Sequence, residues 1–128
     1  MRKIIAYKVV TRLNSGKLCS FNAKSIRSVD GLEYKPGQLV KPRVKNSKLF
    51  AFNNLENAKE LNIHNTEIWK CEIYNPERTK RVPFAMGVPS HLEKKHLEKI
   101  WKQNPKDKNC CFKGTILGDA IRLIEKVK

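Results

Sequence analysis

Basic side chains at alternate positions are the strongest chemical signal in this sequence. Residues 32–52, LEYKPGQLVKPRVKNSKLFAF, hold five basic residues, and Lys41, Arg43 and Lys45 alternate with other residues. Because side chains two apart share a face of an extended chain, these three cations project together. Charge on a regular pitch suits the phosphates of a polyanion. The alternative is that lysine and Pro42 only protect an exposed strand edge against aggregation.

Two further basic groups could extend such a site. ERTKR contributes Arg78, Lys80 and Arg81, and arginine suits phosphate because its planar fork donates two hydrogen bonds at once. SHLEKKHLEKIWKQN predicts an amphipathic helix over 90–104, whose polar stripe carries Lys95, Lys99 and Lys102. A stripe of this kind is equally typical of a solvated helix face. Phe50 and Phe52 could stack on bases, but their place in a short apolar run favours the core.

Other kinds of chemistry have little support in the sequence. There is no GxGxxG, P-loop, HExxH or GxSxG motif, so we predict no catalytic residue and no cofactor. The four cysteines form no CxxC pair, and we expect reduced thiols and no bound metal.

The composition is that of a small, strongly basic protein. The 128 residues contain 27 basic and 12 acidic side chains, a net charge of +15, which favours a nucleic acid or a nucleotide as partner. An acidic protein would satisfy the same charge. No apolar run approaches the roughly 20 residues of a membrane span, so we expect a cytoplasmic protein without membrane contact.

Period-two patterns predict most of the fold. IIAYKVV alternates, and we place Ile5, Tyr7 and Val9 inside and Lys8 and Arg12 outside. EIWKCEIY predicts a strand with Trp69, Cys71 and Ile73 inward. Turns are predicted at 14–16, 28–31 and 35–37, and a two-turn helix capped by Asn53 or Asn54 after LFAF. Residues 118–128 fit a strand or a helix, and Gly118-Asp119 favours the strand.

These elements predict one α+β domain over residues 1–128. We expect a mainly antiparallel, curved sheet of six to eight short strands, with one short helix and one longer one.

The order YKVV, GKLCSF, LEYKPGQLVKP, LFAFNNLENAKEL, EIWKCEI and GTILGDAIRLIEKV resembles small single-domain proteins of phages and prokaryotes. That resemblance implies a viral or mobile-element protein that acts in the host cytoplasm, with counter-defence as one role. Residues 34–73 also distantly resemble the core of small ADP-ribosyltransferases, which implies an enzyme using NAD. Those enzymes carry a His-Gly-Thr or Arg motif on an early strand, and IAYKVV has neither, so no catalytic residue is carried over.

Taken together, the sequence predicts a non-enzymatic polyanion-binding protein. An NAD-using transferase and an inhibitor that docks on an acidic host protein are the two alternatives.

Overall fold

The computed structural model of the chain describes residues 2–20, 32–43, 47–61, 65–78 and 114–128. Within these ranges there are nine strands and one helix. They are β1 Lys3–Arg12, β2 Leu18–Ser20, β3 Glu33–Tyr34, β4 Leu39–Val40, β5 Leu49–Phe52, α1 Leu55–Lys59, β6 Thr66–Tyr74, β7 Glu77–Arg78, β8 Thr115–Gly118 and β9 Ala120–Lys126. The number of strands is slightly above the predicted six to eight, because three of them are only two residues long.

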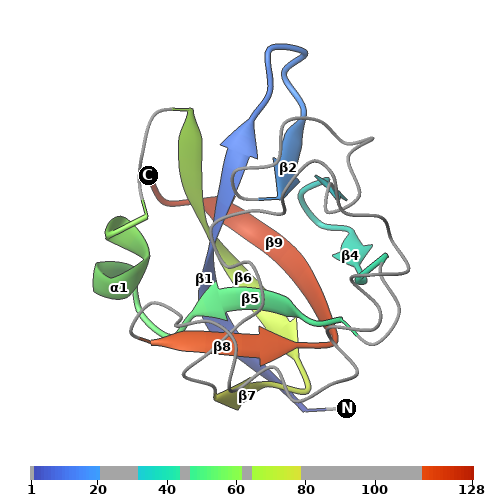
Figure 1. Cartoon of the computed structure of the whole chain (residues 1–128), viewed down its shortest axis with the longest axis vertical. Coiled ribbons are helices and arrows are strands. Elements are labelled where there is room, and N and C mark those ends of the chain that lie inside the picture. The colour runs from blue at the N-terminus through green and yellow to red at the C-terminus, as the bar shows by residue number, and fades with distance from the viewer. Residues whose placement is uncertain (1, 21–31, 44–46, 62–64, 79–113) are drawn as a thin grey trace, which may run out of the picture.

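All strand pairs are antiparallel, as predicted, and they form one sheet. Its main order is β4-β9-β6-β1-β5-β8-β7, with β2 paired to β1 and β3 paired to β2. The long strand β1 pairs with β6 along nine residue pairs, from Lys3 opposite Tyr74 to Thr11 opposite Thr66. In contrast, β1 meets β5 at one pair only, Tyr7 opposite Phe52. β5 and β8 therefore turn away from β1, and Figure 1 shows them crossing its direction.

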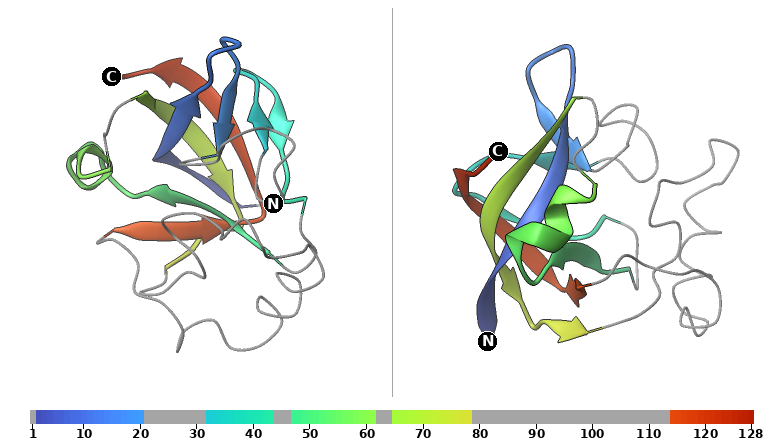
Figure 2. Two further views of the ribbon diagram at one scale, coloured as in Figure 1. Left: turned by 45° about the horizontal axis from the view of Figure 1, so that its top comes forward. Right: turned by 90° about the vertical axis from the view of Figure 1, so that its left-hand side faces the viewer.

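The sheet has a buried cluster on each face. The larger one, the inner cluster, includes Ala6, Val10, Tyr34, Cys71 and Leu123. The smaller one includes Val9, Phe52, Ala58, Leu61 and Ile68, with Tyr7, Phe50 and Leu55 packed against it. This second cluster lies where α1 contacts β1 and β5 (Figure 2). The central strand β1 is thus covered on both faces over part of its length.

Local sequence signals account for the short helix and the turns. The side chain of Asn54 accepts a hydrogen bond from the backbone N–H of Asn57, which caps α1 as predicted. The backbone N–H of Gln38 donates to the carbonyl of Lys35, and Gly37 between them has φ +83°. This is the predicted turn at 35–37, and glycine adopts such a φ without steric cost.

The predicted faces of the strands are confirmed for β6, whereas for β1 they are confirmed at Val9, which is buried, and at Arg12, which is 41 % exposed, and wrong at Ile5 and Lys8. On β6, Cys71 and Ile73 are buried and Trp69 packs against the inner cluster. On β1, Ile5 is 47 % exposed and Lys8 is buried. The error arises because the even positions of β1 face the inner cluster, and the odd ones are covered only where α1 lies against them.

The C-terminal residues form strands, as the Gly118-Asp119 turn suggested. β8 ends at Gly118, and β9 continues through Lys126 between β4 and β6. The predicted longer helix at 90–104 and the predicted turn at 28–31 lie outside the described residues.

Candidate functional sites: a cationic edge and a buried lysine

The structure places three of the nine predicted polyanion-binding residues. Lys41 and Arg43 directly follow β4, and both side chains are exposed. Arg78 ends β7, opposite Ile116 of β8. Since β4 and β7 are the two ends of the main strand order, Lys41 and Arg78 do not lie on neighbouring strands. The other six residues lie outside the described residues: Lys45, Lys80, Arg81, Lys95, Lys99 and Lys102.

Pro42 allows either an edge strand or no strand before it, and the structure has a short edge strand there. β4 pairs with β9 through Leu39 opposite Arg122 and Val40 opposite Ile121, and it ends the strand order. The chain then leaves the sheet at Lys41, because Pro42 has no N–H to donate to a ladder. We call residues 35–43 the cationic edge. It begins with Lys35 and ends with Arg43.

Acidic residues are scarce around this edge. The sequence from Tyr34 to Leu55 contains five basic residues and no acidic one. In the described ranges, six of the eight carboxylates are already in ion pairs, and Lys41 is in none of these pairs. The six are Glu33 with Lys35, Glu56 with Lys59, Glu67 with Arg12 and Lys126, Glu72 with Lys3 and Arg122, Asp119 with Lys48, and Glu125 with Lys70.

The second candidate site is the buried amino group of Lys8. Its side chain is 2 % exposed and points to the same side of β1 as Ala6 and Val10. The Nζ atom donates a hydrogen bond of 2.7 Å to the carbonyl oxygen of Phe50. It also lies 4.0 Å from the centre of the Phe50 ring and 5.6 Å from the centre of the Tyr34 ring.

The position of Lys8 follows from the divergence of two strands. β1 and β5 pair only at Tyr7 opposite Phe52, so the carbonyl of Phe50 is left beyond the end of that ladder. The Lys8 ammonium reaches this carbonyl and replaces the missing backbone donor. Lys8 therefore joins β1 to β5 just beyond the point where the two strands stop pairing.

Burial perturbs every ionisable group around Lys8. It lowers the pKa of Lys8 to about 8, because the charged form is desolvated. It raises the pKa of the neighbouring Cys71 thiol to about 12, and it raises the pKa of Tyr34 as well. Cys71 is therefore neutral at pH 7, and no carboxylate of the described residues forms an ion pair with Lys8.

Tyr34 has a polar atom without a partner. Its hydroxyl is buried and makes no hydrogen bond, and it is the one such side-chain atom among the residues described. An unsatisfied buried hydroxyl costs about 1–3 kcal/mol. A buried, unpaired ammonium costs several kcal/mol more. The Lys8 ammonium lies over the ring of this tyrosine, 5.6 Å from its centre.

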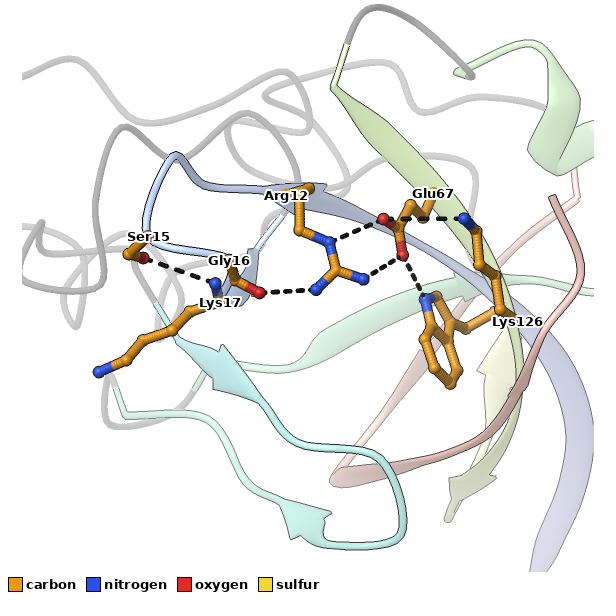
Figure 3. A network of polar contacts seen from close by, with 7 residues as sticks. Arg12, Ser15, Gly16, Lys17, Glu67 and Lys126 are labelled. Atoms are coloured by element: carbon orange, nitrogen blue, oxygen red, sulfur yellow. Dashed lines mark hydrogen bonds and ion pairs between the residues drawn. The ribbon is translucent and has the colours of Figure 1, made fainter.

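A contrasting polar cluster lies at the end of β1. Arg12 donates two hydrogen bonds of 2.8 Å to the two carboxylate oxygens of Glu67 and a third, of 2.6 Å, to the carbonyl of Gly16 (Figure 3). Glu67 also accepts a hydrogen bond of 3.1 Å from the indole of Trp69 and lies 3.9 Å from Lys126. The Arg12 guanidinium holds the pKa of Glu67 below its usual range. This cluster joins the β1–β2 turn to β6 and β9.

The two phenylalanines that could have stacked on bases belong to the protein interior. Phe52 is fully buried beneath α1, and Phe50 is half-buried against the same cluster. Their rings meet edge to face at 6.3 Å. This agrees with the predicted place of both residues in the core.

The structure gives no support for a metal centre or a membrane span in the ranges it describes. No group of three or more His, Cys, Asp and Glu side chains in these ranges could hold a metal ion. No helix found there is long and apolar enough to cross a membrane.

Comparison with known proteins adds no further assignment. No family model, no curated protein and no solved structure matches the chain.

Proposed function

We propose that this chain is a non-enzymatic protein that binds nucleic acid through the cationic edge. The observation that carries the proposal is the exposure of Lys41 and Arg43 beside an edge strand, within 22 residues, 34–55, that contain no carboxylate. A free strand edge is open on one side to an extended ligand.

Three physical features support a polyanion as the ligand. Neutralising phosphates releases counterions, so each exposed cation adds affinity without requiring a base-specific contact. The net charge of +15 favours encounter with any polyanion. Most carboxylates of the described residues are held in ion pairs elsewhere, so they do not neutralise Lys41.

The test is the salt dependence of binding to duplex DNA. Affinity is measured by fluorescence anisotropy between about 50 and 200 mM salt. A variant carrying Lys41→Gln and Arg43→Gln should lose roughly 1.8 from the log–log slope, because each contact with B-DNA contributes about 0.9. A triple variant that also carries Lys45→Gln shows whether this third cation contributes to the salt slope as much as each of the other two.

The matched control removes two cations elsewhere. Lys17 lies in the β1–β2 turn and Lys59 ends α1, and both are exposed. A variant with Lys17→Gln and Lys59→Gln has the same net charge as the edge variant. If both variants lower the slope equally, binding is diffuse and the cationic edge is not a site.

Two other outcomes would replace the proposal. If the parent protein binds no nucleic acid, the edge cations serve only to prevent strand-to-strand aggregation. If polyglutamate is bound and DNA does not compete, the partner is an acidic protein.

A further inference from the structure

Four neighbouring strands, β4, β9, β6 and β1, carry two rows of side chains on the sheet face opposite the inner cluster. Residues directly opposite each other in an antiparallel sheet point to the same face. In the first row such pairs continue across all four strands, in the order Leu39, Arg122, Glu72 and Ile5. In the second row, Lys3 of β1 lies opposite Tyr74 of β6. We call the surface formed by these six residues the outer face.

The exposed parts of the outer face are apolar or positively charged. Ile5 is 47 % and Leu39 is 48 % exposed. The side chains of Lys3 and Arg122 are 48 % and 41 % exposed. The carboxylate of Glu72 is only 12 % exposed, because it lies between these two cations. A ligand on this face therefore meets apolar surface and positive charge, but little negative charge.

The outer face also holds two planar groups. The Nε and Nη2 atoms of Arg122 both donate to one carboxylate oxygen of Glu72, which fixes the plane of the guanidinium. Lys3 pairs with the other oxygen of Glu72 at 2.9 Å, and its Nζ atom lies 5.8 Å from the centre of the Tyr74 ring. A guanidinium plane and an aromatic ring are the two kinds of surface on which an unpaired base stacks.

We propose that the outer face binds unpaired bases, so that the preferred ligand of this protein is a single-stranded nucleic acid. This inference rests on the proposed function, because the phosphates of the same strand would contact the cationic edge. Lys41 of that edge follows Leu39 of the outer face by two residues. The planar groups favour bases over the side chains of an acidic protein, which would satisfy the charges alone. In a duplex the faces of the bases are stacked on one another and do not reach this surface.

The experiment compares an oligothymidylate of about 16 nucleotides with a duplex of the same length, by fluorescence anisotropy. Electrostatics alone favour the duplex, because each phosphate contact contributes about 0.9 to its salt slope and about 0.7 to that of a single strand. Contacts with bases act in the opposite direction. We therefore expect the single strand to bind more tightly than the duplex.

Two substitutions remove the planar groups, and neither changes the net charge. Tyr74→Leu and Arg122→Lys should each weaken binding of the single strand about tenfold, which is about 1.4 kcal/mol and within the range for one stacked base. Both should leave the salt slope and the affinity for the duplex unchanged. The matched control is Arg12→Lys, because the Arg12 side chain is also 41 % exposed and also pairs with a glutamate. This control should bind both ligands as the parent does.

Failure of this inference and failure of the proposed function give different results. The outer face is not a site if the duplex binds at least as tightly as the single strand, or if Tyr74→Leu and Arg122→Lys bind the single strand like the parent. The cationic edge can then still set the salt slope. If the parent binds neither ligand, both proposals fail.

Two further results complete the test. If polyglutamate binds and its affinity falls in both variants, the outer face binds an acidic protein and the inference is wrong. Urea unfolding checks that each variant is folded. If Tyr74→Leu does not fold, the comparison of Arg122→Lys with Arg12→Lys decides the question.

Discussion

Lys8 and Arg12 lie four residues apart on the same face of β1, yet their surroundings are opposite. Arg12 is at the end of the strand, where 41 % of its side chain is exposed and Glu67 accepts two of its hydrogen bonds. Lys8 is in the middle of the strand, fully enclosed, and bonded to a backbone carbonyl. The alternating sequence pattern predicts that both cations are exposed, but in the structure only Arg12 is.

The difference shows how position along a strand decides the effect of a charge. At the end of the sheet, water and a carboxylate share the solvation of the guanidinium, so Arg12 joins β1 to β6 at little cost. Inside the sheet, the ammonium loses water and gains one carbonyl and two aromatic faces. Arg12 therefore stabilises the fold as an ion pair, whereas Lys8 makes the stability depend on pH.

The largest expected effect is this pH dependence. The pKa of Lys8 is about 8 in the folded protein, whereas that of a lysine without burial, as in the unfolded chain, is 10.5. Between these values the unfolded chain binds one proton more than the folded one, so stability rises with pH. The gain is roughly 3 kcal/mol from pH 8 to pH 10.5, at 1.36 kcal/mol per pH unit. Urea unfolding at a series of pH values measures it.

Lys8→Met is the control for this prediction. Methionine has a flexible, unbranched side chain that can fill the same space, and it cannot titrate. Because other lysines and tyrosines also titrate at high pH, the informative quantity is the difference between the two proteins. Parallel pH profiles for parent and Lys8→Met would show that Lys8 retains its ordinary pKa and is not enclosed.

The next largest effect concerns the partner of Arg12. Glu67→Gln removes the carboxylate that accepts hydrogen bonds from Arg12 and Trp69 and forms an ion pair with Lys126, and it should lower the free energy of unfolding by about 2 kcal/mol. Since the pKa of Glu67 is depressed in the folded state, its contribution is present above the unfolded pKa and lost as pH falls through the folded value. The variant should therefore lose less stability in acid than the parent.

Glu125→Gln is the matched control for Glu67→Gln. Glu125 is 65 % exposed and lies 3.9 Å from Lys70, so its replacement should change stability by less than about 0.5 kcal/mol. Equal losses from the two variants would mean that the Arg12–Glu67 cluster has no more effect than an ordinary surface pair.

Much of the fold could be predicted from local patterns. The turn at Gly37, the Asn54 cap, the inward face of β6 and the C-terminal strand all follow from spacing and turn chemistry within a few residues. The order of the strands could not be predicted, because pairs such as β4 with β9 join residues about 80 positions apart. No local pattern records such contacts.

The two candidate sites differ in the same way. The cationic edge was visible because alternate basic residues and a proline act locally. The buried Lys8 was misassigned because Tyr7 and Val9 set the expected inner face. Ala6 and Val10, two positions before and after Lys8, are also apolar. Apolar residues at both odd and even positions indicate a strand that is covered on both faces. No sequence pattern predicts the hydrogen bond from Lys8 to the carbonyl of Phe50, which is 42 residues away.

The smallest expected effect concerns the cations of the edge, which extend the comparison to a third environment. Lys41 and Arg43 are exposed, so replacing both by glutamine should change the free energy of unfolding by less than about 0.5 kcal/mol at any pH. Their charges would then affect ligand binding and not the stability of the fold, in contrast to those of Lys8 and Arg12. Urea unfolding at pH 7 and at pH 10 measures this on the same protein used for the salt titration. A loss above about 1 kcal/mol would show that the edge cations pack against the sheet, and a change in salt slope could no longer be attributed to phosphate contacts.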